Sequence, residues 1–312
     1  MHGNGYQRKT LSPQMLAALP LLACLAGNMT LAFGPWFVRL ADVGPVASAF
    51  WRIALAVPVL IALSHIGQRR PFAAAPGLWL VLAFSGVAFA ADLAAWHLGI
   101  LRTTLANATL FGNSATLMFP IYGFLVARAW PSRSQGTALA LAALGAALLL
   151  GRSYSLSPKN LAGDLLCLLA GTLYTVYFIM MARAREAMAP LPALAMSSLG
   201  SALPLLAFAW LIGETIWPNH WGILFGLAMA SQVVGQGLMI YAIGHLSPLV
   251  VGIALLSQPI VAGAVGWFVY DERLGWPDFL GALLVAVALV LVRRGPVASN
   301  AGNTKSEAEG IR

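Results

Sequence analysis

The chain has 312 residues, of which 60% are hydrophobic and only 9% are charged, and its mean hydropathy is +0.81. Soluble globular domains carry about 25% charged residues, so this composition excludes that class and indicates an integral membrane protein. The formal net charge of +8 does not indicate nucleic-acid binding, because the Lys and Arg residues fall between apolar segments and form no continuous basic face.

Ten apolar segments, separated by Arg, Pro and Gly, are long enough to predict membrane-spanning helices, each of which needs about 20 apolar residues. The expected spans are 15–37, 46–65, 77–99, 104–127, 135–151, 162–183, 192–212, 221–243, 248–270 and 277–292. Residues 1–14 form a short N-terminal segment in this prediction, and residues 295–312 form a disordered polar tail.

The distribution of basic residues predicts the orientation in the membrane. With ten spans both termini lie on one side, and basic residues gather at the termini and near residues 69–70, 128–133 and 183–185. Because cytoplasmic loops are enriched in Lys and Arg, both termini are predicted to be cytoplasmic in a bacterial inner membrane.

The two halves of the sequence resemble each other. Residues 21–27 align without gaps with residues 165–171, and Ile100 to Ser114 align with Ile243 to Ser257, at offsets of 144 and 143. An odd number of spans in each half inverts the second copy, and inverted repeats place a substrate site at their interface near the midplane. We therefore expect a five-helix repeat at 15–151, a periplasmic linker at 152–161 and a second five-helix repeat at 162–294, all α-helical.

Ionisable residues inside a membrane are costly and mark candidate functional sites. Asp92 lies in the third span, one helical turn before Trp96, so a carboxylate and an aromatic ring share a face that suits an ammonium group or a coupled proton. Structural roles for both residues stay open. For Arg52, at the outer part of the second span, we favour a structural role, because that span is expected to be peripheral.

Uncharged polar residues gather in spans 1, 4, 6, 8 and 9, which together with span 3 are expected to line a cavity. Each residue alone is more often a contact between helices, so the hypothesis rests on the group. The substrate-binding candidates, with Asp92 and Trp96, are Asn28, Asn113, Tyr174, Tyr177, Gln232, Gln236, Ser257 and Gln258.

Gating candidates are His97, near the outer end of the third span, and Pro259, which follows Gln258 and can kink its helix. Asp92 is the candidate for proton coupling. The sequence contains no nucleophile triad, phosphate-binding loop or cluster with metal-ligand spacing, so no enzyme activity, metal or cofactor is expected.

Several motifs resemble the ten-helix EamA-type exporters of the drug/metabolite transporter superfamily. Residues 44–56 (GPVASAFWRIALA) are similar to the start of helix 2 in that family, and residues 257–274 contain its proline and acidic turn. The first half departs from the pattern, with Thr116 where the proline is expected and Ala129 where the Glu is expected. The resemblance implies export of amino acids and other small metabolites across the inner membrane, and one branch exports aromatic amino acids.

Together these features predict a secondary transporter that exports small metabolites, most simply neutral or aromatic amino acids, by alternating access. Polar residues beside an aromatic wall favour a zwitterion with a large side chain. A multidrug or other metabolite exporter of the same fold is the main alternative, and an intramembrane enzyme acting on lipid-linked substrates is a remote one. The expected partners are a small-molecule substrate and the lipid bilayer, and the oligomeric state stays open.

Overall fold

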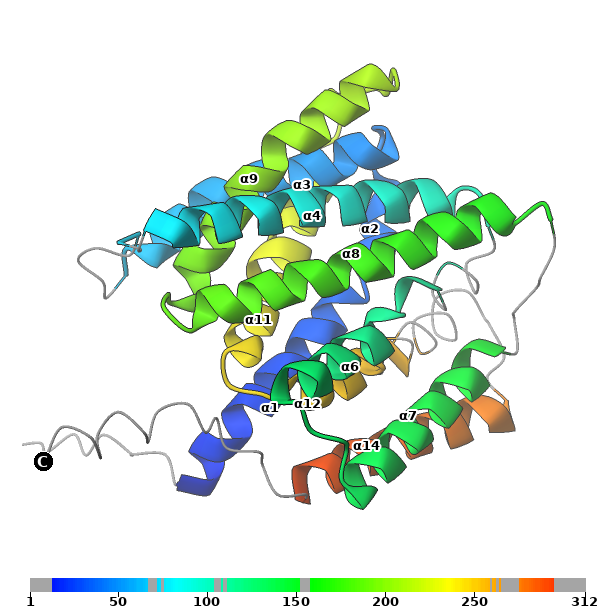
Figure 1. The fold of residues 1–312 in the computed structure, drawn as a ribbon. Coiled ribbons are helices and arrows are strands. Elements are labelled where there is room, and N and C mark those ends of the chain that lie inside the picture. The colour runs from blue at the N-terminus through cyan, green and yellow to red at the C-terminus, as the bar shows by residue number, and fades with distance from the viewer. Residues whose placement is uncertain are drawn as a thin grey trace, which may run out of the picture.

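The computed structural model describes residues 13–66, 72–73, 76–103, 108, 111–151, 158–258, 260–261, 264 and 275–294. All regular elements within these residues are helical (Figure 1). They are α1(Pro13–Leu31), α2(Gly34–Leu40), α3(Pro45–Ser64), α4(Pro76–Ile100), α6(Ala115–Ala127), α7(Arg133–Gly151), α8(Leu161–Arg185), α9(Pro190–Leu211), α10(Trp221–Leu227), the π-helix η1(Ala228–Gln236), α11(Gly237–Ile243), α12(Pro248–Leu255) and α14(Trp276–Arg294).

Six helical segments of the described chain are long and apolar enough to cross a membrane. They are Ala17–Val38, Pro45–Ser64, Gly77–Ile100, Leu161–Arg185, Pro190–Leu211 and Trp221–Ile243, and two shorter apolar helices occupy Ala115–Ala127 and Phe279–Val292. Large apolar side chains such as Leu80, Phe84 and Leu203 are exposed on the outer faces of these helices. Soluble proteins rarely expose so much apolar surface, so the molecule is a multi-pass membrane protein.

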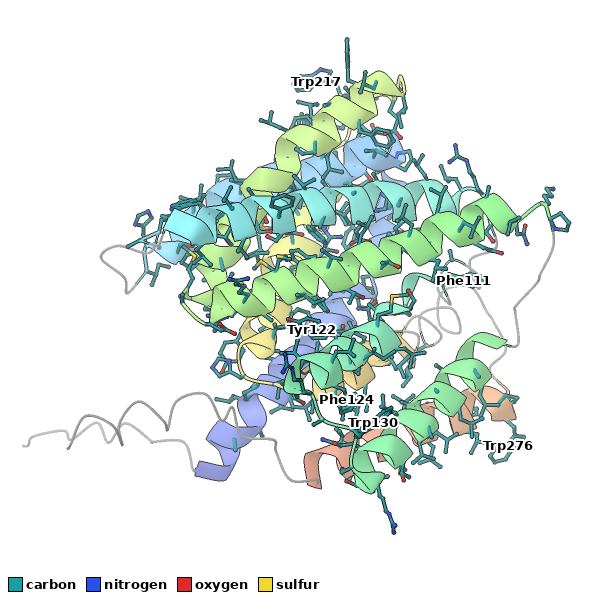
Figure 2. All side chains as sticks on the ribbon, in the orientation of Figure 1. Phe111, Tyr122, Phe124, Trp130, Trp217 and Trp276 are labelled. Atoms are coloured by element: carbon teal, nitrogen blue, oxygen red, sulfur yellow. The ribbon has the colours of Figure 1, made fainter. Side chains whose placement is uncertain are left out.

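Several tryptophans are exposed, and Trp217 and Trp276 lie at the edge of the molecule in Figure 2. Trp130, Trp217 and Trp276 are among the most exposed aromatic side chains that the structure describes. Tryptophan is enriched where a membrane meets water, which agrees with positions next to helix ends.

The helices form two groups in Figure 1. Helices α3, α4, α8 and α9 pack together in the upper part of the view, and α7 packs against α14 in the lower part. Helix α1 crosses between them and contacts η1, α11 and α12. The start of α1 and the end of α14 both lie on the left of the view, in agreement with an even number of membrane crossings.

Small residues allow the central helices to approach closely. A Cβ atom on Gly86 of α4 would lie 2.4 Å from the backbone oxygen of Ser197 in α9, and one on Gly99 would lie 2.5 Å from the Cys167 sulfur in α8. The hydroxyl groups of Ser85 and Ser197 are 2.7 Å apart in the same α4–α9 contact. Close packing and hydrogen bonds between polar side chains associate helices where lipid provides no hydrophobic driving force.

The loop after α9 fixes the beginning of α3. The Glu214 carboxylate accepts hydrogen bonds from the backbone N–H groups of Val46 and Ala47, at 3.2 and 2.8 Å. These are donors that the first turn of a helix leaves without partners, and a negative charge is favourable there. The indole N–H of Trp51 donates to the Ile216 carbonyl at 2.6 Å. The second half of the chain thus holds the helix that carries Arg52.

Several predicted spans are interrupted rather than continuous. The first span is divided into α1 and α2, and the eighth contains α10, η1 and α11. In the fourth span the helical backbone is broken at Asn113 and Ser114, and α12 of the ninth span ends at Leu255. Most of residues 104–110, 152–157 and 265–274, the N-terminal segment up to residue 12 and the tail 295–312 lie outside the described residues.

Candidate functional site

A cavity of roughly 150 Å³ lies where the two halves of the chain meet. The first half contributes the end of α1, α2, α3, α4 and the residues around the break before α6, and the second half contributes α8, α10, η1 and the end of α12. The volume is well above the 10–15 Å³ that one water molecule needs. It therefore has room for a small organic molecule. The lining side chains used below are Arg52, Phe89, Asp92, Trp96, His97, Asn113, Tyr174, Gln236 and Gln258.

Arg52 brings a positive charge to this cavity. It lies on the buried face of α3, which also carries the fully buried Ala49, Ile53 and Ala56, and it is only 6% exposed. Its Nε–H donates to Gln232 Oε1 at 3.1 Å, and its guanidinium lies 5.6 Å from the centroid of the Phe89 ring. The second span was expected to be peripheral, but α3 packs against α4, α9 and η1, and the Arg52 side chain lines the cavity.

Asp92 brings a negative charge to the same cavity. It is 8% exposed and projects from the middle of α4. Its carboxylate makes no hydrogen bond to a side chain within the described part of the protein, and no ion pair with Arg52 forms at 4.0 Å or less. A carboxylate and a guanidinium therefore face one small cavity without closing on each other, which leaves both available to a ligand of mixed charge.

The break in the ninth span is stabilised by polar side chains. The Ala254 carbonyl, at the end of α12, accepts hydrogen bonds from Asn28 Nδ2 at 3.1 Å and from the Ser257 hydroxyl at 2.8 Å. Gln258 lines the cavity and donates to Asn28 Oδ1 at 2.8 Å. Backbone groups at membrane depth need such partners. Asn28 and Ser257 therefore support the break and do not line the cavity, unlike Gln258.

The break in the fourth span corresponds, in the sequence repeat, to the break in the ninth span. Asn113, at that break, lines the cavity, and it aligns with Leu256 at the offset of 143 that relates the two halves. Backbone hydrogen bonds of the short i to i+3 type, from Ser114 to Phe111 and from Thr116 to Asn113, carry the chain through the break. Both halves thus interrupt the corresponding helix beside the cavity.

The π-helix η1 spans nine residues of the eighth span and carries both predicted glutamines. Gln236 lines the cavity and donates to the Tyr174 hydroxyl at 3.2 Å, while its buried Oε1 has no partner among the described residues. Gln232 does not line the cavity, because its side chain is used by Arg52 and Ser198. π-Helical turns are rare and frequent at functional sites.

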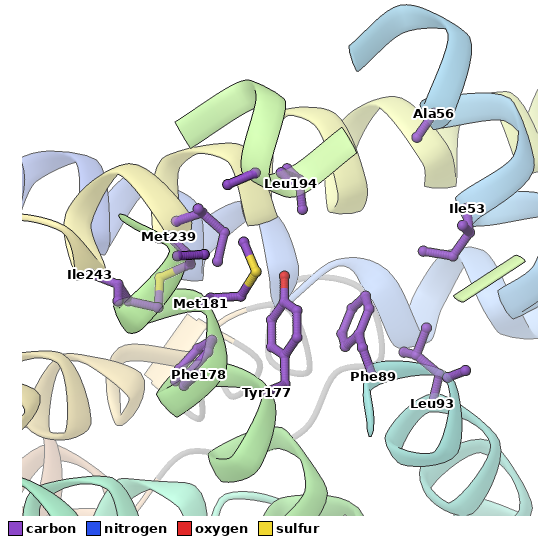
Figure 3. Packing of buried hydrophobic residues seen from close by; sticks show 14 of the residues in the cluster. Ile53, Ala56, Phe89, Leu93, Tyr177, Phe178, Met181, Leu194, Met239 and Ile243 are labelled. Atoms are coloured by element: carbon purple, nitrogen blue, oxygen red, sulfur yellow. The ribbon is translucent and has the colours of Figure 1, made fainter. Parts of the chain in front are cut away.

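A stack of aromatic rings forms the wall behind the cavity (Figure 3). The Phe89 and Tyr177 rings are 4.4 Å apart at an angle of 19°, and Tyr174 lies 5.9 Å from Tyr177. Phe89 and Tyr174 line the cavity, whereas Tyr177 is fully buried behind them against Met181 and Phe178. Tyr177 was predicted to bind substrate, but in the structure it packs behind the aromatic residues that line the cavity.

The remaining predictions are divided between the cavity and its surroundings. Trp96 lines the cavity, with its indole nitrogen beside Gly112. His97 also lines it, and its Nδ1 is 2.6 Å from the Pro45 carbonyl, which ties the end of α4 to the start of α3. Pro259 lies outside the described residues. Phe89 was missed, since one Phe among many in apolar spans gives no distinguishing signal.

Comparisons with known proteins find similarity to membrane transporters. Residues 161–294 match the EamA-like transporter family. The chain is 26% identical over 256 residues to an uncharacterized transporter of Archaeoglobus fulgidus, an alignment that covers 79% of this chain and 86% of that protein. A protein of known crystal structure shares the fold, with a TM-score of 0.73 over 89% of this chain and 96% of that one at 15% identity. The second half of the chain thus carries the pattern of a membrane transporter family.

Proposed function

We propose that the whole chain is an EamA-like secondary transporter that exports small zwitterionic metabolites, with neutral amino acids as the substrate class. The observation that carries the proposal is the cavity between the halves, which presents the Arg52 guanidinium and the Asp92 carboxylate to the same space. A free amino acid has one carboxylate and one ammonium group. Arg52 would bind the carboxylate and Asp92 the ammonium group, so each buried charge gains a partner when the substrate enters.

The aromatic wall supports a substrate with an apolar side chain. Phe89, Trp96 and Tyr174 lie around the charged pair. Rings of this kind stack on an apolar or aromatic side chain and also attract an ammonium group. Neutral amino acids of medium or large size, aromatic ones included, fit this combination.

The packing of the helices supports an inverted-repeat architecture. Helix α3 packs on α9 and α7 on α14, and the sequence repeat pairs the same helices, while α6 of the fourth span packs on α12 of the ninth, the span that the repeat pairs with it. Helix α4 packs on α8 just as α1 packs on η1 and α11. Exchanging the two halves therefore reproduces the main contacts, as expected for repeats related by a twofold axis.

This architecture supports alternating access as the proposed transport mechanism. In our proposal the two repeats rock against each other around the cavity, and the broken fourth and ninth spans bend beside the bound substrate. The protein would lie in a bacterial inner membrane with both termini in the cytoplasm, as the basic residues indicate.

A multidrug exporter of the same fold is the second candidate. The Asp92 carboxylate beside Phe89, Trp96 and Tyr174 would suit an organic cation. Arg52 argues against a substrate that carries only positive charge, because a buried guanidinium would then face a second cation.

Uptake by proteoliposomes tests the proposal. The purified protein is reconstituted, and uptake of labelled neutral, aromatic, acidic and basic amino acids and of a labelled organic cation is measured with and without a pH gradient, against empty liposomes. Saturable uptake of neutral members is expected. Uptake of organic cations without any amino acid uptake would favour the multidrug exporter and exclude the proposed substrate class.

A further inference from the structure

The Arg52 side chain is held from behind by two buried polar residues of the second half. Its Nε–H donates to Gln232 Oε1 at 3.1 Å, and Gln232 Nε2 donates in turn to the Ser198 hydroxyl at 2.9 Å. Gln232 is fully buried and Ser198 is 1% exposed. The three residues belong to α3, η1 and α9, so this hydrogen-bonded chain crosses between the halves of the protein.

The two hydrogen bonds of the Gln232 amide determine which of its ends faces Arg52. An amide group has one acceptor oxygen and one donor nitrogen. Because the Gln232 nitrogen donates to Ser198, its oxygen faces Arg52, where only an acceptor is compatible with the guanidinium. The guanidinium, which can only donate, therefore selects the oxygen end of the Gln232 amide, and Ser198 holds the other end in place by accepting from Nε2.

Use of the Nε–H leaves the outer edge of the guanidinium for a ligand. Arg has five N–H donors in a rigid plane, four of them on the two terminal nitrogens. The terminal nitrogens make no hydrogen bond to described residues, and the Phe89 ring lies 5.6 Å from the guanidinium carbon. Two parallel N–H groups at one edge match the two oxygens of a carboxylate.

We infer that Gln232 and Ser198 are positioning residues that hold Arg52 so that its outer edge binds the substrate carboxylate. The inference rests on the proposed function and adds a specificity rule: the transporter requires a carboxylate and rejects the same molecule with a neutral carboxamide. A mobile arginine would provide the charge without the fixed two-point geometry and would discriminate less.

The test compares an amino acid with its carboxamide. Proteoliposomes containing wild-type protein, Gln232→Met, Ser198→Ala or Ser85→Ala are assayed for KM and kcat with a transported neutral amino acid, and for inhibition by its carboxamide. Gln232→Met keeps the volume of the side chain and removes its acceptor. Ser85→Ala is the matched control, because it removes another buried hydroxyl contact to α9 that does not reach Arg52.

We expect Gln232→Met to raise KM for the amino acid about tenfold, the effect of losing a hydrogen bond to a charged group. Inhibition by the carboxamide should stay unchanged, so the preference, the ratio of the carboxamide inhibition constant to the KM of the amino acid, should fall about tenfold. Ser198→Ala should lower this preference by a smaller factor. Ser85→Ala should leave the preference unchanged. Because the preference is a ratio measured on one preparation, it does not depend on how much protein folds.

Two results separate the failure of this inference from the failure of the proposed function. If wild-type protein prefers the amino acid and both Gln232→Met and Ser198→Ala keep that preference, the positioning role is wrong and the substrate class stands. If wild-type protein transports no amino acid, or does not distinguish it from the carboxamide, the proposed substrate class is wrong as well.

Discussion

Asp92 is the residue whose substitution should most directly affect a zwitterionic substrate. In Asp92→Asn the ammonium group loses its counter-charge while Arg52 keeps its own, and loss of one partner of a buried charge pair costs about 2 kcal/mol or more, roughly thirtyfold in affinity. We expect a corresponding rise in KM in proteoliposome uptake. If Asp92 also carries the coupled proton, the pH dependence of uptake should flatten.

The matched control for that substitution is Asp42→Asn, since Asp42 lies in the loop before α3 and does not line the cavity. Its uptake should keep the wild-type KM. Equal KM values for Asp92→Asn and wild-type protein would contradict a role for Asp92 in substrate binding.

Asp42 itself gives a prediction about stability and pH. Partial desolvation raises the pKa of Asp42, but hydrogen bonds from the Asn219 backbone and the His220 ring outweigh it, so the pKa lies below its ordinary value. A depressed carboxyl pKa stabilises the folded state above the ordinary pKa of about 3.9 and loses this effect as pH falls through the lowered value. Asp42→Asn should therefore lower Tm in detergent at pH 7, and the difference should shrink below about pH 4. A difference in Tm that does not shrink at all as the pH falls below about 4 would show that charge is not its source.

At the residue scale, several residues singled out because polar groups are rare inside a membrane lie at the cavity, and their role in substrate binding stays a prediction. Asp92, Trp96, Asn113 and Gln236 all line the cavity. The position of Arg52 at the cavity was not predicted, because the direction of a long side chain depends on which face of α3 is buried, and that face is defined only by α4, α9 and η1. Gln232 and Tyr177 were predicted to bind substrate, but their side chains lie behind the residues that line the cavity. Helical spacing does not distinguish lining residues from the residues packed behind them.

At the scale of helices, the contact between α4 and α9 should be sensitive to a single methyl group. In Gly86→Ala the new Cβ would lie 2.4 Å from the Ser197 backbone oxygen, and the backbone cannot yield as a flexible side chain would. Overpacking of this kind costs about 1–3 kcal/mol. We expect a lower Tm in detergent.

Gly77→Ala is the control on the same helix, because nothing lies within 4 Å of a Cβ atom at that position. It should unfold like wild-type protein or slightly later, since Ala is the better helix former. Equal Tm values for the two variants would show that α4 and α9 are not as close as the structure has them.

Helix boundaries were predictable from apolar length, and helix interruptions were not. The positions of α3, α4, α8 and α9 agree with the predicted spans to within a few residues. The π-helix η1 and the breaks near Ser114 and Leu256 occur inside segments whose apolar character is continuous. They depend on tertiary partners, such as Asn28 at the Ala254 carbonyl, which local sequence does not reveal.

For the whole molecule, the orientation in the membrane can be tested with thiol reagents. Lys159 and Ala129 are exposed and lie beyond opposite ends of α7, whose 19 residues extend about 28 Å, close to the thickness of a bilayer core. We expect a membrane-impermeant reagent to label Lys159→Cys in intact cells and Ala129→Cys only after the membrane is opened.

The wild-type chain is a suitable background for this experiment, because Cys24 and Cys167 are both buried and should not react. The reverse pattern of labelling would place the termini outside and overturn the orientation predicted from the basic residues.

The origin of the two cavity charges has a consequence for how a substrate crosses. Arg52 and Asp92 both belong to the first half, while the lining residues of the second half, such as Tyr174 and Gln236, are uncharged. A symmetric pair of identical halves would offer two sets of charges and two equivalent poses to its cargo. In the proposed function this asymmetry gives a zwitterionic substrate a single binding orientation, with its side chain directed to the aromatic wall. This would allow the transporter to distinguish mirror-image forms of the same amino acid.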